Sequence, residues 1–119
     1  MKKTKYNLEL YKLKSRLCKT LADPVRLMII QELRDGERSV SDIQTALEIP
    51  QAAVSRHLAI LRDAGVVLTR REKTNIYYRL TDFKICQACD MVNDILISQI
   101  ETNRNLVMKL VGQTKTEGI

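Results

Sequence analysis

Apolar residues recur at helical spacing over most of the chain. Leucines three or four residues apart, from about position 8 to position 21, predict a first amphipathic helix that ends before Pro24. Pro24 suits the first turn of a second helix, for which Asp23 is the expected N-cap. Asp35-Gly36 is a stop signal, so this helix should end at about Leu33. Three of its residues are expected to face the core: Leu27, Ile30 and Leu33.

The next two segments form a helix-turn-helix candidate. Ser39 followed by Asp42 is a capping-box-like start for a short helix, Val40–Leu47, whose Ile43 and Leu47 should point inward. After a turn at Pro50, a second helix is predicted over residues 51–64, with Gly65 as the residue that ends it. Its apolar positions have helical spacing: Val54, Leu58 and Leu61.

A β-hairpin and a long helix complete the predicted order. Residues 66–71 and 76–80 are rich in β-branched and aromatic side chains and flank the polar tip Lys73-Thr74-Asn75. From about Thr81 a helix is predicted to run to about Leu110 with an apolar stripe along it. This helix is longer than so small a core can cover. Its surplus apolar surface, together with that of the first helix, is therefore expected to pack against a second copy of the chain.

The expected fold is thus mainly α with a small β-hairpin, in the order α-α-α-α-β-β-α. We expect one domain over residues 1–119, with a core from about 8 to 110 and loose ends, the second starting at Gly112. The chain has no run of eighteen apolar residues and no apolar stretch typical of a signal peptide after Met1. A cytoplasmic protein without a membrane span is expected, with its three cysteines as reduced thiols.

The charge balance favours a polyanionic partner. The chain has 20 Lys and Arg against 14 Asp and Glu, a formal net charge of +6. Because most charge clusters are solvated surface, only their local arrangement can indicate nucleic acid. Here the basic residues fall on or beside the helix-turn-helix and the hairpin, which is the arrangement that a DNA-binding surface requires.

Four segments carry a resemblance to a known family. They are Leu21-Ala-Asp-Pro-Val-Arg-Leu27, Val54-Ser-Arg-His-Leu58, Leu61-Arg-Asp-Ala-Gly-Val-Val67 and Tyr78-Arg-Leu80. In this order and spacing they resemble the ArsR/SmtB family of winged helix-turn-helix repressors, over roughly residues 10–96. The resemblance implies a homodimer formed through the first and last helices. It also implies that the dimer occupies double-stranded operator DNA and leaves it when a metal, metalloid or thiol-reactive signal binds.

The helix over residues 51–64 is the expected recognition helix, whose N-terminal part enters the major groove. Its candidate base-reading residues are Gln51, Ala52, Ser55 and Arg56. Gln pairs with adenine, Arg pairs with guanine, and Ala packs on a thymine methyl, whereas Ser55 has a phosphate as its alternative partner. Basic and polar residues beside it are candidates for phosphate or minor-groove contacts: Arg62, Arg70, Arg71, Lys73, Asn75 and Arg79.

His57 is the only histidine of the chain. A catalytic or metal-binding role would need a second histidine or a patterned carboxylate, and neither accompanies it. By resemblance it belongs to the Ser-Arg-His-Leu motif. A structural or phosphate-contacting role is therefore expected.

The cysteines are candidate effector ligands. Cys86 and Cys89 lie three residues apart in the predicted last helix, so both side chains project from one face. Thiolates select soft ions, and two are too few for a closed zinc site. Cys18 is the candidate third ligand, because the first and last helices are expected to lie together in the dimer. Three thiolates suit a trigonal metalloid, which the resemblance to the family implies to be As(III) or Sb(III), with Cd(II) as a further candidate; no permanent cofactor is expected.

The chain departs from two sensor sites of the family it resembles. Where a Cys-x-Cys arsenical site often stands, the chain has Ser39-Val40-Ser41. Of the zinc-type site in the last helix only Asp82 remains, since Lys84, Ile95 and Ser98 occupy the other positions. Neither site is therefore expected here.

Four alternatives stay open. The thiols of Cys86, Cys89 and Cys18 are also suited to sensing oxidants, persulfide or polysulfide, or they are small hydrophobic side chains of the core. A thiol-disulfide redox enzyme is a further class, but its Cys-x-x-Cys normally follows a strand, and the chain has no Gly-rich loop or acid-base pair. A pure dimerisation module is the last alternative.

Overall fold

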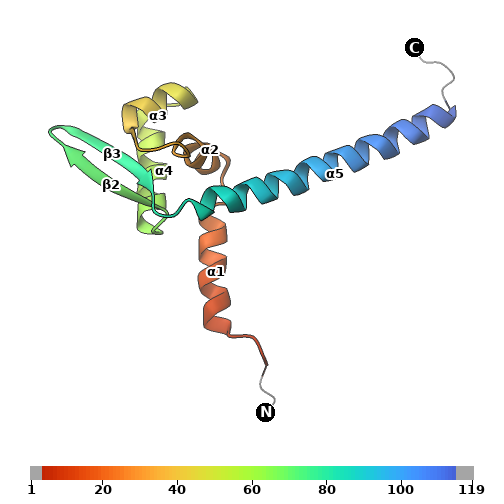
Figure 1. The fold of residues 1–119 in the computed structure, drawn as a ribbon, viewed down its shortest axis with the longest axis horizontal. Helices are drawn as coiled ribbons and strands as arrows, with labels where there is room; N and C mark the ends of the chain where they lie inside the picture. The colour runs from red at the N-terminus through yellow and green to blue at the C-terminus, as the bar shows by residue number, and fades with distance from the viewer. Residues whose placement is uncertain (1–3, 115–119) are drawn as a thin grey trace. The chain divides into compact units, whose positions relative to one another are not determined.

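The computed structural model describes residues 4–114 and has five helices and three short strands (Figure 1). Their order along the chain is α1 Leu8–Thr20, α2 Pro24–Glu32, β1 Arg38–Ser39, α3 Val40–Leu47, α4 Gln51–Asp63, β2 Val67–Glu72, β3 Asn75–Leu80 and α5 Lys84–Thr114. The predicted mainly helical fold with a hairpin is confirmed, and each predicted helix is present. Strand β1 is an addition that the sequence did not indicate.

The chain divides into two compact units, Met1–Cys86 and Gln87–Ile119. The first contains every element except most of α5, and its helices α2, α3 and α4 pack together beside the hairpin. In the described part of the second unit, α5 is the only element. The single domain over residues 1–119 stays a prediction.

The hydrophobic core of the first unit comes mainly from α2, α3, α4 and the start of β2, with Tyr78 of β3 and Cys86 of α5 also buried. Its fully buried side chains include the predicted Ile30, Leu33, Ile43, Val54, Leu58 and Leu61, together with Ile29, Val66 and Val67. The position of Leu27 was predicted wrongly, since it is 41% exposed. The buried arc of α2 is centred on Ile29, Ile30 and Leu33, and Leu27 lies to one side of it.

Local capping explains where the short helices begin. The Asp23 carboxylate accepts hydrogen bonds from the backbone N–H groups of Val25 (2.8 Å) and Arg26 (3.2 Å), as expected for the N-cap of α2. At α3 the Ser39 hydroxyl accepts from the Asp42 N–H at 3.1 Å, and the Asp42 carboxylate accepts from the Ser39 N–H at 3.3 Å. This is the reciprocal capping box that the sequence predicted.

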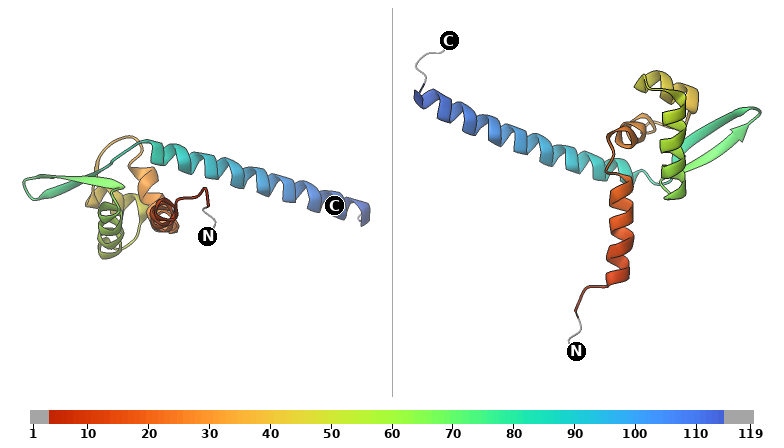
Figure 2. Two further views of the ribbon diagram at one scale, coloured as in Figure 1. Left: turned by 90° about the horizontal axis from the view of Figure 1, so that it is seen from below. Right: turned by 180° about the vertical axis from the view of Figure 1, so that it is seen from behind.

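The three strands form an antiparallel sheet in the order β1-β3-β2. Strands β2 and β3 make the hairpin, which extends from the helices in every view (Figure 2). Strand β1 is only two residues long and pairs Arg38 with Tyr78 and Ser39 with Tyr77. Two residues are too few to show an alternating pattern, which is why the sequence did not reveal this strand.

The ends of the chain differ from the sequence prediction in one respect. The predicted loose end was placed from Gly112 onward, but α5 continues through Gly112 to Thr114. Residues 1–3 and 115–119, the rest of the predicted loose ends, lie outside the described residues. Among the described helices, none combines the length and apolar character needed to cross a membrane.

Candidate functional site

Helix α4 separates a buried face from an exposed one. Val54, Leu58 and Leu61 are fully buried against the rest of the first unit. The helical repeat therefore turns the opposite face of α4 toward solvent. The four predicted base-reading residues are all exposed near the N-terminal end of the helix: Gln51, Ala52, Ser55 and Arg56.

Helix α3 precedes α4 through a short turn, which completes the helix-turn-helix. Glu48 at the end of α3 adopts a left-handed conformation, with φ of 56°, and Pro50 immediately precedes α4. α3 and α4 pack on each other. This arrangement leaves the start of α4 accessible, as a helix that enters the major groove requires.

The hairpin β2-β3 follows α4 in the chain and has a polar tip. Lys73 and Thr74 connect the strands, and Lys73 has a φ of 58°, a conformation that suits a tight turn. The predicted contact residues Arg71, Lys73, Asn75 and Arg79 are exposed. The hairpin therefore keeps basic and polar side chains accessible, as the wing of a winged helix does.

Arg70, a further predicted contact residue, is held by two carboxylates. Its guanidinium donates two hydrogen bonds to Glu37, from Nε at 3.2 Å and from Nη2 at 2.5 Å, and a third from Nη1 to Glu72 at 3.0 Å. It also lies 4.8 Å from the centre of the Tyr77 ring, on its cross-strand partner. Arg70 thus fastens the hairpin to the segment before β1.

The electrostatics of this cluster follow from its hydrogen bonds. The bonds from Arg70 hold the pKa of Glu37 below its ordinary value, and they outweigh partial desolvation. The same bonds, from Glu37 first and Glu72 second, raise the pKa of Arg70. The charge of Arg70 is therefore balanced locally, in contrast to that of Arg71, which forms no ion pair with any residue that the structure describes.

Arg62 is half-exposed near the end of α4. Its nearest carboxylate is that of the adjacent Asp63, with Nη2 and Oδ1 3.4 Å apart. Such an exposed pair contributes little, because both groups remain solvated. Arg62 is thus accessible for the predicted phosphate contact, which stays a prediction.

His57 lies on the side of α4 that faces α2. Its side chain is only 12% exposed, and its Nδ1 is 3.2 Å from Nη1 of Arg26 and 3.9 Å from Oδ1 of Asp23. Partial desolvation raises the pKa of Asp23, but hydrogen bonds from the Arg26 and Val25 N–H groups and the nearby charge of Arg26 lower it by more, so the net shift is downward. Of the two roles expected for His57, this geometry fits the structural one.

Arg26 and Glu37 are residues that sequence reasoning missed. Arg26 lies inside the segment Leu21–Leu27 that carried the resemblance, but its partner His57 is 31 residues away. The partner of Glu37 is 33 residues away. No periodicity connects positions so distant, so only the folded chain reveals these pairs.

The three candidate effector ligands differ in exposure. Cys86 is fully buried, Cys89 is half-buried, and Cys18 on α1 is exposed. Both Cys86 and Cys89 lie in α5, near its N-terminal end. Within residues 4–114 of a single chain, no group of three or more His, Cys, Asp or Glu side chains is arranged to hold a metal ion.

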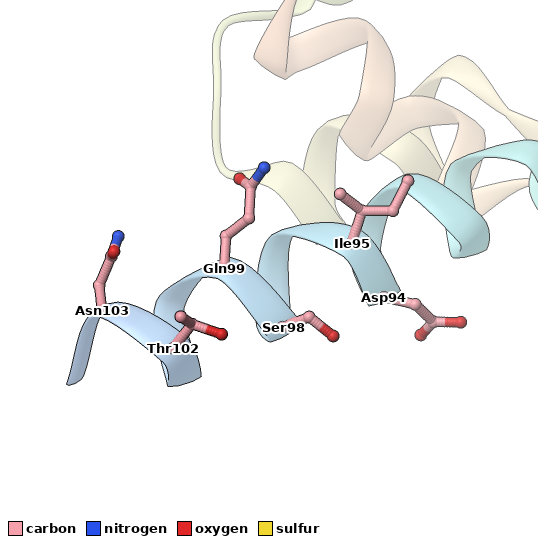
Figure 3. A pocket seen from close by; sticks show the side chains of 6 residues that line it. All are labelled: Asp94, Ile95, Ser98, Gln99, Thr102 and Asn103. Carbon is pink, nitrogen blue, oxygen red and sulfur yellow. The ribbon is translucent and has the colours of Figure 1, made fainter. Parts of the chain in front are cut away.

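A shallow hollow lies along α5, lined by six of its side chains: Asp94, Ile95, Ser98, Gln99, Thr102 and Asn103 (Figure 3). All six come from one helix, and Asp94 is the only titratable group among them. The figure shows Ile95 and Gln99 on one side of the helix and Asp94 and Ser98 on another. The six lining residues offer no acid-base pair.

Comparison with known proteins agrees with this geometry. Residues 23–69, from the start of α2 into β2, match the family described as bacterial regulatory protein, arsR family. The biofilm growth-associated repressor of Xylella fastidiosa is 40% identical over 85 residues, which cover 71% of this chain and 75% of that protein. The chain belongs to the arsR family. The resemblance noted in the sequence is thereby confirmed.

Two further arsR-family comparisons extend over more of the chain. The arsenical resistance operon repressor of Escherichia coli is 35% identical over 99 residues, 82% of this chain and 85% of that protein. The second is a solved structure from Mycobacterium bovis, a homodimeric winged helix-turn-helix DNA-binding domain described as a possible ArsR-family transcriptional regulator. It superposes with a TM-score of 0.72 at 30% identity and covers 84% of this chain and 93% of that one.

These findings establish the class of protein. As an arsR-family member with a winged-helix fold, the chain is a DNA-binding transcriptional regulator and not an enzyme. Helix α4 takes the place of the recognition helix, and the hairpin β2-β3 takes that of the wing.

Proposed function

We propose that this chain represses transcription as a homodimer on operator DNA and is released when a thiophilic metal or metalloid binds its cysteines. The observation that carries the proposal is the position of Cys86 and Cys89 in α5 of an arsR-family winged helix. Their spacing in one helix directs both thiols to a common side. Repressors are named among the relatives, including the one for arsenical resistance.

The exposed start of α4 supports the DNA-binding part of the proposal. Gln51 and Arg56 carry the donors and acceptors that read adenine and guanine edges in the major groove. Arg71 and Lys73 of the wing supply charges for phosphates. We expect Arg56→Ala to weaken operator binding by about 5- to 150-fold and to relax base preference, without altering effector binding.

Exposed apolar side chains on the first and last helices support the homodimer. In α1 no residue is buried, and Leu10, Leu13 and Leu17 are about half-exposed. In α5 large apolar side chains are exposed at Val92, Leu96, Ile100, Leu106 and Leu110, among others. Contiguous exposed apolar side chains of this kind usually mark a surface that another chain covers. A second copy would cover both helices, and the Mycobacterium bovis neighbour is described as homodimeric.

The chemistry of the cysteines supports a soft effector. Thiolates prefer soft cations, and trivalent arsenic and antimony take three of them. Cys86 and Cys89 would supply two, and Cys18 of the same chain or of the second copy would supply the third. Because Cys86 is fully buried, binding requires the start of α5 to repack. The effector thus binds a rearranged state better than the state that fits DNA, which is the condition for release. A coupling of about 1–3 kcal/mol would weaken operator binding about 5- to 150-fold.

Fluorescence anisotropy of a duplex taken from the DNA upstream of the chain's own gene tests this proposal. Under anaerobic conditions the complex is titrated separately with arsenite, antimonite, Cd(II), Zn(II) and a polysulfide. We expect release by arsenite, antimonite or Cd(II), lost in both Cys86→Ser and Cys89→Ser, with DNA affinity of the variants unchanged. Cys18→Ser then shows whether a third thiol takes part.

The other outcomes contradict the proposal in different ways. Release by polysulfide alone would assign the thiols to sulfur or redox sensing. Release by none of these agents, with DNA binding intact, would make the cysteines ordinary core residues. Absence of salt-dependent DNA binding would favour the dimerisation module instead.

A further inference from the structure

One arginine joins the end of α1 to α4, two segments of the first unit that are distant from each other in sequence. The Arg26 guanidinium donates from Nε to the Thr20 carbonyl at 2.6 Å, from Nη2 to the Lys19 carbonyl at 3.5 Å and from Nη1 toward Nδ1 of His57 at 3.2 Å. Thr20 and Lys19 form the C-terminal end of α1, whereas His57 lies in α4. We call this set of three interactions the Arg26 bridge.

The donors of Arg26 define the role of Nδ1 of His57 in the bridge. A guanidinium has only donors, so Nδ1 of His57 is the acceptor in this hydrogen bond. Protonation of Nδ1 would remove the acceptor and place a second positive charge beside Arg26. It would also turn Nδ1 into a partner for Asp23, whose Oδ1 is 3.9 Å away. The charged groups facing His57 from α2 and its N-cap are therefore Arg26 and Asp23.

The bridge connects the two functional parts of the molecule. The Lys19 and Thr20 carbonyls immediately follow Cys18, and α1 carries exposed apolar side chains that we assign to the dimer. At the other end, His57 directly follows the exposed Ser55 and Arg56. Arg26 and His57 are both part-buried, so the pair links the end of α1 to α4 from the inner side of α4.

We infer that Arg26 is a positioning residue for DNA recognition, which sets the orientation of α4 relative to the end of α1 through His57. The inference rests on the proposed function and deepens it, since it assigns the contact through which α1 affects the recognition helix α4. Neither residue of the pair touches DNA on this account. Their loss therefore weakens binding by misplacing Arg56 and its neighbours.

The test is a double-mutant cycle on DNA affinity with Arg26→Gln, His57→Leu and the two combined. Anisotropy is measured on the upstream duplex at several salt concentrations. We expect each single variant to weaken binding by roughly tenfold, the double variant to be no weaker than either single one, and the slope of log affinity against log salt to stay unchanged. Additive losses would overturn the inference, as would a slope reduced by about 0.9 in His57→Leu, which indicates a lost phosphate contact.

A conservative variant keeps the test decisive if His57→Leu folds poorly. In His57→Asn the amide oxygen lies near the place of Nδ1 and can accept from Arg26, so operator binding should recover to within about threefold of the unmodified chain. Circular dichroism checks that each variant has native helix content. Binding by His57→Asn as weak as by a folded His57→Leu would overturn the inference.

The same experiment separates this inference from the proposed function. If the unmodified chain binds the duplex and the Arg26 variants bind equally well, the inference fails and the proposed function stands. If the unmodified chain does not bind with a salt-dependent affinity, the proposed function fails and removes the basis of the inference.

Discussion

The winged-helix part and the two terminal helices use their apolar residues in opposite ways. Between α2 and β3, side chains such as Ile43 and Leu58 are fully buried within one chain. In α1 none is buried, and in the described part of α5 only Cys86 is. The first region therefore buries its apolar residues within one chain, whereas the terminal helices need an additional partner to cover them. An effector that binds the thiols of α5 would therefore act on a helix whose packing depends on dimer formation.

Burial in the winged-helix part predicts the largest effect on stability. Leu58→Ala deletes a fully buried side chain from α4 and should lower the free energy of unfolding by about 2–5 kcal/mol. The loss should not depend on protein concentration, because the site lies within one chain. Urea denaturation measures it, with Leu68→Ala as the control, since Leu68 is 43% exposed and should change little. Equal losses in both variants would remove the contrast between buried and exposed leucines.

A charge on α5 predicts an effect on assembly instead. Ile100→Asp places a carboxylate on the exposed apolar surface of this helix and should raise the dimer dissociation constant by roughly tenfold or more. Sedimentation equilibrium measures the change, and Ile100→Val, which keeps the surface apolar, is the matched control. If the dimer of Ile100→Asp is as stable as that of the unmodified chain, this part of α5 is not in the interface.

Arg70 and Arg71, two neighbouring arginines of the wing, should contribute differently to the salt dependence of DNA binding. Arg71→Ala should reduce the slope of log affinity against log salt by about 0.9, the change for one lost phosphate contact. Arg70→Ala should change the slope less, because Glu37 and Glu72 already balance this charge. Anisotropy over a salt series compares them. A larger slope change for Arg70 would mean that DNA displaces both carboxylates.

The smallest expected effect is a pH dependence of stability at Glu37. Its pKa is lowered in the folded chain, so the pairing with Arg70 stabilises the fold above the ordinary carboxyl pKa of 4.5. That contribution is lost as the pH falls through the lowered folded value. Urea midpoints of the unmodified chain and of Glu37→Gln should therefore differ at pH 7 and converge in acid. A constant difference at all pH values would contradict this assignment.

The order of the helices and the exposed face of α4 could be predicted from the sequence, because both follow short-range patterns. The capping box of Ser39 and Asp42 and the buried set Val54, Leu58 and Leu61 depend on neighbours within about seven residues. Exposure of Gln51 and Arg56 then follows from helix geometry.

Contacts between distant positions could not be predicted in this way. The Arg70–Glu37 pair and the Arg26–His57 contact of the bridge each join positions more than 30 residues apart. Strand β1 is too short to show a period. Leu27 has the spacing of a core residue, yet the arc of α2 that is buried depends on the packing of α3 and α4. The proposed cysteine site is harder still to predict, because on our proposal a second copy of the chain can supply part of it.

The most direct test of the link between the terminal helices and the DNA-binding part is the ratio of operator affinity with and without arsenite. It is measured by anisotropy for the unmodified chain, Cys86→Ser and Cys89→Ser at one protein concentration. Our account predicts that arsenite weakens binding about 5- to 150-fold in the unmodified chain and leaves both variants unchanged. Equal weakening in all three proteins would show that these thiols do not control DNA binding.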